Sequence, residues 1–279
     1  MAGISGESLK AALADLESVL PTASLPLAEE LFGILATLDS SAGLRRALTD
    51  PSRSAEAKAA LVRSLVNGKV SAQAGDLAAA LAASRWANVR DLGDALETMA
   101  ATVAIAVAEN RPGSSSGGAV SGISGLEQLE SDLFAFSRAV DSSHEVQRAL
   151  SEPQASDAAK SALAMKLVPA AGEEARVLIQ QAVSHPRGIK ATKLVECFAT
   201  LAAERQQRWI AAVSVSRPLT PAQLDRLQSG LNALYGRELK VNTIVDPTLI
   251  GGVRVRVGDE VVDASVISRL GDLRRQLAG

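Results

Sequence analysis

The sequence predicts a mainly α-helical protein, with two related helical bundles in tandem followed by a small C-terminal α/β module. Apolar residues recur at helical spacing through most of the chain, as in the stripe between Leu126 and Val140. A long stretch of the sequence also recurs further along, which indicates a duplicated unit. Near the C-terminus the pattern changes to the two-residue alternation of a half-buried strand, at Val253, Val255 and Val257.

The internal repeat has an offset of 102 residues. It aligns Leu27 to Val66 with Leu129 to Val168 without a gap, and 17 of the 40 pairs are identical. The apolar pattern continues beyond the identities, since Leu96 falls on Phe198. One helical fold is therefore predicted to occur twice.

The first copy is predicted to hold six helices with clear stop and start signals. Pro51 and Pro153 end short helices, and Ser54 and Ser156 are N-caps because their hydroxyls can accept a bond from the first helical turn. Asn67-Gly68 is a predicted C-cap. The expected helices lie near residues 7–20, 25–38, 41–48, 55–66, 72–83 and 88–108.

The second copy is predicted to repeat only the last five of these helices. The offset places its first helix on residues 109–122, ENRPGSSSGGAVSG, and such Gly/Ser-rich sequence is typical of a linker. The predicted domains are a helical bundle at 1–110, a linker at 111–125, a second bundle at 126–208 and an α/β module at 209–279.

The C-terminal module has the predicted element order β-α-β-β-β-α. Residues 210–216 alternate as a strand, and Thr220 to Gln223 form a capping box with proline at the first helical position. We expect the helix that follows to end at Gly236, and a last helix to cover about 266–277. Four leucines of the first of these helices are expected to face inward, namely Leu224, Leu227, Leu231 and Leu234.

The most specific pattern of the chain is VDPTLIGGVRVRVGDEVVDASV at residues 245–266. Asp246 and Pro247 break the strand expected at 239–245, and Gly251 and Gly252 permit a positive φ or close packing. Gly258 and Asp259 form the two-residue turn of a hairpin. We interpret these six residues as a structural signature.

Residues that could carry out chemistry are few and isolated. No P-loop string is present, so the chain is predicted not to be an ATPase by itself. His144 and His185 are the only histidines, and neither has a Cys or His at metal-ligand spacing. Cys197 is interpreted as a buried small hydrophobe and Glu173-Glu174 as a solvated helix start. The sequence therefore predicts no catalytic residue, no metal site and no cofactor.

Charge and hydropathy exclude two kinds of partner. The formal net charge is -2, with 29 Lys and Arg scattered among 31 Asp and Glu, so no basic face is expected for nucleic acid. The longest apolar, uncharged run is Met99 to Ala108, about half of the ~20 residues that a membrane-spanning helix needs. No direct membrane insertion is predicted, and membrane association is expected to come through partners.

Two stretches of the sequence resemble a known family. Residues 236–270, GRELKVNTIVDPTLIGGVRVRVGDEVVDASVISRL, resemble the C-terminal signature of the delta subunit of F-type ATP synthases, the oligomycin-sensitivity-conferring protein family. LRRALTDPSRSAEAKAALV at 44–62 resembles the family's helical bundle. The chain departs from the usual member by its second bundle, a feature of long actinobacterial members. The resemblance implies a non-catalytic stator, or peripheral-stalk, subunit at the cytoplasmic face of the cell membrane.

The resemblance also implies two partners. In that family the helical bundle grips the N-terminal helix of an alpha subunit, and the C-terminal module holds the C-terminal ends of the b subunits. Because the first helix is missing from copy two, copy one is the expected alpha-binding bundle. Alternatively, an extension of the helix that ends near Ala108 would complete copy two and leave copy one as a spacer or second contact. The alternative is an all-α helical-repeat scaffold unrelated to ATP synthesis, which has no reason to end in an α/β module.

Overall fold

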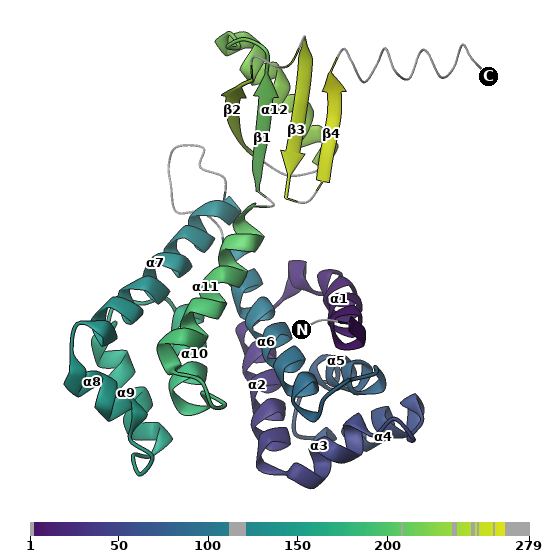
Figure 1. Ribbon diagram of the computed structural model, residues 1–279, viewed down its shortest axis with the longest axis vertical. Coiled ribbons are helices and arrows are strands. Elements are labelled where there is room, and N and C mark those ends of the chain that lie inside the picture. Colours follow the sequence, from purple (N-terminus) through teal and green to yellow (C-terminus); the bar gives the residue numbers. More distant parts are fainter. Residues whose placement is uncertain are drawn as a thin grey trace. The chain divides into compact units, whose positions relative to one another are not determined.

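The computed structural model describes residues 3–111, 121–207, 209–235, 239–246, 249, 251–258 and 260–265. In this part of the chain the protein is mainly helical, with twelve α-helices and a four-stranded sheet (Figure 1). The chain divides into two compact units. One contains Met1–Arg111 and Gln128–Ala202, and the other contains Pro112–Glu127 and Ala203–Gly279.

The helices before residue 112 lie within two residues of the predicted boundaries, except for the first, which begins at Gly3 and ends at Glu17 rather than covering 7–20. They are α1 Gly3–Glu17, the 3-10 helix η1 Leu20–Thr22, α2 Leu25–Ser40, α3 Ala42–Thr49, α4 Ala55–Val66, α5 Ala72–Ala83 and α6 Val89–Glu109. The predicted caps are confirmed, since the Ser54 hydroxyl accepts a 3.2 Å bond from the backbone N–H of Ala57. Gly68, after the C-cap Asn67, has a φ of +72°.

Five helices lie between residues 121 and 207. They are α7 Ser121–Asp141, α8 His144–Ser151, α9 Asp157–Leu167, α10 Glu173–Ser184 and α11 Ala191–Gln207. The predicted cap Ser156 accepts a 3.2 Å bond from the N–H of Ala159. Helix α7 begins before the stripe predicted to start at Leu126, because Ile123 and Leu126 are both buried and this apolar burial outweighs the weak helix propensity of the neighbouring Gly and Ser.

Helix α2 packs against α6, and α4 packs against α5, in the unit that contains both sets of helices. Leu27, Leu31 and Leu35 recur every fourth residue on α2 and are all buried, as a helix with one core face requires. Helix α10 packs against α9 and also against α6. For clarity, α1 to α6 are called the first segment and α7 to α11 the second segment.

Two expectations about the second segment are wrong. Cys197 is exposed, because the buried stripe of α11 is Leu194, Val195, Phe198 and Ala202, and one helical step from Phe198 points the thiol outward. Glu174 is buried rather than solvated, because its carboxylate pairs with the guanidinium of Arg111.

The C-terminal module contains a mixed sheet with strand order β2-β1-β3-β4 (Figure 1). Its elements are β1 Ile210–Val215, α12 Pro221–Tyr235, β2 Lys240–Val245, β3 Gly252–Val257 and β4 Glu260–Ser265. Strand β1 is parallel to β2 and antiparallel to β3, and β3 is antiparallel to β4. The capping box is confirmed, since the Thr220 N–H donates to Gln223 Oε1 at 2.9 Å and the Gln223 N–H to Thr220 Oγ1 at 3.4 Å.

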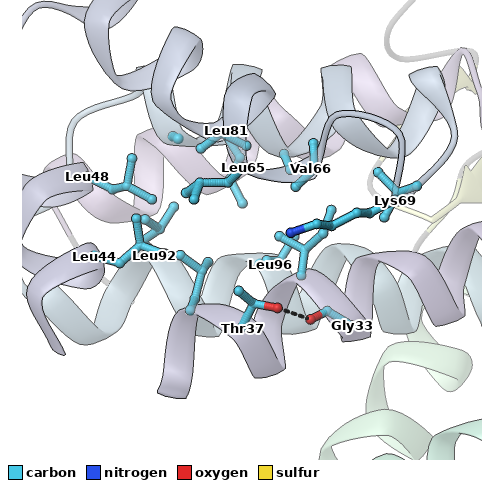
Figure 2. A pocket seen from close by; sticks show the side chains of 16 residues that line it. Gly33, Thr37, Leu44, Leu48, Leu65, Val66, Lys69, Leu81, Leu92 and Leu96 are labelled. Atoms are coloured by element: carbon cyan, nitrogen blue, oxygen red, sulfur yellow. Dashed lines mark hydrogen bonds between the residues drawn. The ribbon is translucent and has the colours of Figure 1, made fainter. Parts of the chain in front are cut away.

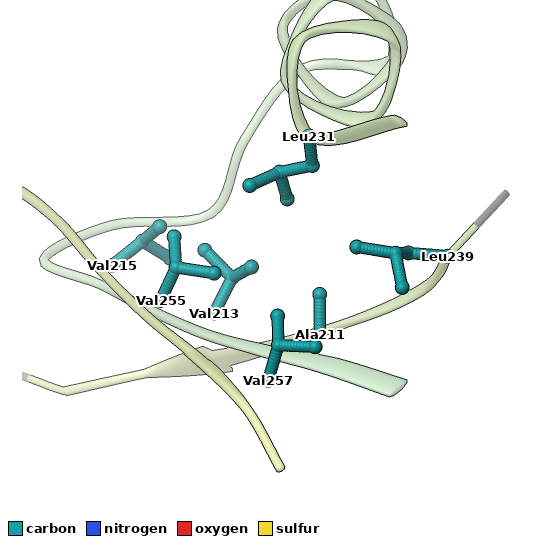
Figure 3. Close-up of a cluster of buried hydrophobic side chains, with 7 residues drawn as sticks. All are labelled: Ala211, Val213, Val215, Leu231, Leu239, Val255 and Val257. Atoms are coloured by element: carbon teal, nitrogen blue, oxygen red, sulfur yellow. The ribbon is translucent and has the colours of Figure 1, made fainter. Parts of the chain in front are cut away.

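One face of the sheet packs against α12. Figure 3 shows the buried cluster between them, formed by Ala211, Val213, Val215, Leu231, Leu239, Val255 and Val257. The expectation that Leu234 faces inward is wrong, since this side chain is 68% exposed. Tyr235, four residues after Leu231, packs against the cluster instead, because a step of four keeps a residue on the same helix face. The predicted stop at Gly236 and the last helix at 266–277 lie outside the described residues.

Candidate docking surfaces

The first segment contains an apolar pocket of about 260 Å³. Side chains of α2, α3, α4, α5 and α6 line it, together with the turn after α4, whereas α1 contributes none of its described residues. Figure 2 shows the leucines turned toward one another around the hollow. We call it the leucine pocket, after Leu38, Leu44, Leu48, Leu65, Leu81, Leu92 and Leu96.

The rim of the leucine pocket is more polar than its floor. Gly33, Thr37 and Lys69 are exposed, while Leu81 and Leu92 are buried. The Thr37 hydroxyl is satisfied by a 3.0 Å bond to the carbonyl oxygen of Gly33 (Figure 2). Lys69 is the one charged residue among the described residues of the lining, and it forms no ion pair within the described part of the chain. The pocket therefore suits an apolar side chain that has a carboxylate beside it.

The second segment carries larger side chains at two of the matching positions. Ile34 and Leu96 line the leucine pocket, and 102 residues further along the chain stand Phe136 and Phe198. Both phenylalanines are fully buried, at 0% and 2% exposure. Their rings add volume where the first segment leaves a hollow.

The second segment has instead a polar hollow of about 670 Å³. Asp141, His144, Arg148, Lys160 and Lys190 line it, with residues from the start of α11. His144 is exposed at the first position of α8. Among the residues that the structure describes, no group of three or more His, Cys, Asp or Glu could hold a metal ion.

The structural signature lies around strand β3. The Asp246 N–H donates a 2.8 Å bond to the Val215 carbonyl just after β2 ends, and the Asp246 carbonyl accepts a 3.1 Å bond from Leu249. Gly252 and Gly258 have φ values of +83° and +58°, a region that favours glycine. Gly251 immediately precedes β3. Pro247 and Asp259 lie outside the described residues.

The sheet face opposite α12 carries exposed aliphatic and basic groups. The strand registers place Ile244, Arg254, Arg256, Val261 and Asp263 on this face. Ile244 and Val261 are 58% and 54% exposed, and Arg254 pairs with Asp263 at 3.2 Å. A mixed surface of this kind is typical of a protein contact.

An apolar pocket and a sheet face with exposed aliphatic side chains are typical of a protein that binds other proteins. None of the helices in the described ranges is both long and apolar enough to cross a membrane.

The comparison with known proteins identifies the family. The model of the ATP synthase delta (OSCP) subunit family matches residues 119–277. "ATP synthase subunit delta" of Pseudarthrobacter chlorophenolicus is 73% identical over 279 residues, with all of both chains covered. The protein of the same name from Renibacterium salmoninarum is 66% identical, with all of both chains covered. The protein of that name from Streptomyces coelicolor is 38% identical, with 100% of this chain and 98% of its own length covered. The chain belongs to the ATP synthase delta (OSCP) subunit family.

This chain is therefore a non-catalytic component of the peripheral stalk of an F-type ATP synthase, as its resemblance implied. Sequence reasoning missed the leucine pocket. The available signal was the difference in size between Ile34 and Phe136 and between Leu96 and Phe198 within the repeat.

Proposed function

We propose that this chain links the catalytic head of the synthase to its b subunits from the cytoplasmic face of the cell membrane. The helical part would bind the N-terminal helix of an alpha subunit, and the C-terminal module would bind the C-terminal ends of the b subunits. A stator has to resist the torque of the rotor, and broad apolar contacts with slow dissociation meet that demand.

The leucine pocket supports the first segment as the site for the alpha helix. An amphipathic helix binds a groove through apolar anchors spaced three and four residues apart. The pocket is open at a rim of Gly33, Thr37 and Lys69, and it offers room for one such anchor above buried leucines. Burying one large aliphatic side chain contributes about 1.5–3 kcal/mol.

The full-length chain with Thr37→Trp tests this site. The indole would block the rim without entering the core, because Thr37 is exposed. We expect the dissociation constant for a synthetic N-terminal peptide of the cognate alpha subunit to rise about tenfold or more in calorimetry, which corresponds to ~1.4 kcal/mol. The matched control is Ala139→Trp, at the corresponding position of the second segment, and it should leave binding unchanged.

One observation favours the second segment instead. The family model begins to match at residue 119, just before α7, so the bundle that ordinary family members share corresponds to the second segment. Peptide binding that is unaffected by Thr37→Trp but lost with Ala139→Trp would assign the alpha helix to the second segment. Titration of residues 1–110 and of residues 112–279 as separate chains gives an independent check.

We further propose that the two segments are duplicates, joined by a linker that begins at 111 and ends where α7 begins at Ser121, and followed by a separate domain at 209–279. The helix positions support it. Helices α3, α4 and α6 begin at residues 42, 55 and 89, and α8, α9 and α11 begin 102 residues later, at 144, 157 and 191. Limited trypsin digestion should cut first between the two bundles. Early cleavage inside either bundle would contradict these boundaries.

The exposed face of the sheet supports the C-terminal module as the site for b. Ile244 and Val261 offer apolar surface beside the basic side chains of Arg254 and Arg256. We expect Ile244→Asp to weaken binding of a C-terminal b fragment by about tenfold, since it removes apolar burial and adds a charge. The control is Asn242→Asp, which adds the same charge to the same face of β2. Equal losses in both variants would argue against an apolar contact there.

A further inference from the structure

Helix α10 of the second segment packs against α6 and α2 of the first, within a single compact unit. Charged contacts join α10 to α6 near both ends. Arg111, just after α6, meets Glu174 at the start of α10, whereas Arg187, just after α10, meets Asp94 near the start of α6. The two helices are therefore antiparallel and are joined at two separated points.

Arg187 forms the buried end of this contact. Its guanidinium nitrogens lie 2.8 Å from Asp39 Oδ2, 2.7 Å from Asp94 Oδ1 and 3.3 Å from Glu97 Oε2. Asp39 belongs to α2, and the other two carboxylates belong to α6. The Arg187 side chain is only 9% exposed. One cation from the second segment thus binds carboxylates on two helices of the first.

The backbone of the loop after α10 is shaped for this contact. Arg187 has a φ of +51°, a left-handed conformation that costs free energy for any residue with a Cβ atom, and Gly188 follows with a φ of +85°. The Arg187 carbonyl accepts a 2.9 Å bond from Arg90 Nη2 of the first segment. A strained residue persists only where its surroundings hold it, and here those surroundings belong to the other segment.

Helix α6 leaves space for the guanidinium at Gly93. A Cβ atom at that position would lie 3.2 Å from Cζ of Arg187 and closer still to Nη2. Any larger residue would therefore force the guanidinium of Arg187 to shift from its present position. The glycine is matched to an arginine that lies 94 residues further along the chain.

The other end of α10 is held in a similar way. The Glu174 side chain is 7% exposed and pairs with Arg111, which itself is 44% exposed. The start of α10 is also fixed within its own segment, because the Gly172 N–H donates a 2.9 Å bond to Asp132 Oδ2 on α7. Arg111 therefore binds a part of the second segment that is already held in place.

We propose that Arg187 and Arg111 form a two-point clamp that holds the two helical segments as one rigid body, with Arg187 as its main positioning residue. Residues 94 and 111 are separated by about 25 Å along the helix at 1.5 Å per residue. A single contact would let α10 pivot on α6, whereas two contacts so far apart oppose the pivot. The inference goes beyond the proposed function, because it does not depend on which segment binds alpha.

Spin-label distance measurements on the full-length chain test the clamp. Cys197 is the one cysteine of the sequence and is exposed on α11, and Glu29→Cys supplies an exposed partner site on α2. With both labels, the otherwise unchanged protein should give one narrow distance distribution. Arg187→Met should at least double its width, Glu174→Gln should widen it less, and the double variant should widen it most.

Three further variants separate the clamp from a general loss of structure. Gly93→Ala should widen the distribution as Arg187→Met does, although Arg187 is intact, whereas Gly33→Ala should not, because no atom lies within 4 Å of its added Cβ. Arg187→Lys should give a distance distribution of intermediate width, broader than that of the unchanged protein and narrower than that of Arg187→Met. Lysine keeps the positive charge but lacks the planar guanidinium that binds several carboxylates at once. Circular dichroism of each variant serves as the control, and each spectrum should show unchanged helix content.

The surface pair of Arg63 and Asp76 provides the control for charge removal, because these side chains are 59% and 68% exposed within the first segment. Arg63→Met should leave the distribution narrow. A double Arg187→Met, Glu174→Gln variant with the original width would overturn the clamp, and so would equal widening by Arg63→Met. Neither result depends on a partner, so the proposed function would remain separately testable.

Discussion

The two helical segments share their helix pattern and differ in what fills the space between their helices. In the first, Ile34 and Leu96 line an open apolar pocket of about 260 Å³. In the second, Phe136 and Phe198 are fully buried at the matching positions. The spacing of apolar residues determines where helices form, whereas side-chain volume decides whether a bundle closes its own core or keeps room for another chain.

The largest expected effect comes from emptying the closed core. Phe136→Ala should lower the free energy of unfolding by about 3–5 kcal/mol, because it leaves a cavity in a packed interior. Ile34→Ala, at the matching position of the first segment, should cost clearly less, since Ile34 borders a hollow that already exists. Urea unfolding followed by circular dichroism measures both. An equal loss of unfolding free energy in Phe136→Ala and Ile34→Ala would contradict the conclusion that the second segment is closed where the first has a pocket.

A substitution in the C-terminal module provides a reference outside both segments. Gly252→Val should cost about 1–3 kcal/mol, because a β-branched residue resists the φ of +83° at the start of β3. Hydrogen exchange should show the loss in the sheet and leave the amides of α2 and α6 unchanged. The control is Ala212→Val, which adds the same side chain at a strand residue with an ordinary backbone. Unchanged exchange in the sheet of Gly252→Val would refute the strain argument.

The contact between the segments should respond to pH through Glu97. Burial raises the pKa of this carboxyl above its ordinary value of 4.5, and the nearby Arg187 opposes that shift without cancelling it. Burial lowers the pKa of Arg187, but Glu97, Asp39 and Asp94 outweigh it and the pKa is raised, so the guanidinium stays charged.

The sign of the effect follows from these shifts. Between pH 4.5 and the higher folded-state pKa, the folded chain holds the Glu97 proton more tightly than the unfolded chain, so this group's contribution to stability is lost as the pH rises. The variant Glu97→Gln has no carboxyl to titrate at this position. The free energy of unfolding of Glu97→Gln minus that of the unchanged protein should therefore increase with pH across this window. Glu29→Gln, on the exposed surface of α2, is the control. A stability difference that does not vary with pH would exclude the effect.

The smallest expected effect is the exchange that makes the first segment like the second. Leu96→Phe should change the free energy of unfolding by less than about 1.5 kcal/mol, because the pocket offers volume for the ring. The same variant should weaken binding of the alpha peptide if the pocket is its site. The reverse exchange, Phe198→Leu, should destabilise the chain more than Leu96→Phe does, since it leaves a void. A strongly destabilised Leu96→Phe would show that the pocket cannot accept a ring.

Much of the fold could be predicted from the sequence because its signals are local. The prolines, the serine caps and Asn67-Gly68 place most helix ends within a few residues, since a cap depends only on its own turn. The alternation around Val255 and the two-residue turn after Val257 predicted the hairpin. The prediction that Leu234 faces the sheet was wrong. Leu234 and Tyr235 lie three and four residues after Leu231, and this spacing alone does not decide which of the two packs against the sheet.

The sequence by itself determined the family, most of the helix boundaries and the repeat, because periodicity, caps and short motifs depend on residues close together in the chain. Only the tertiary structure decided which polar groups are buried and which surfaces meet. Arg187 and Asp39 are 148 residues apart, and no local pattern predicts that they bond. Burial of Glu174, exposure of Cys197 and the open leucine pocket likewise depend on how separate helices pack, which is a property of side-chain volume and charge summed over the whole unit.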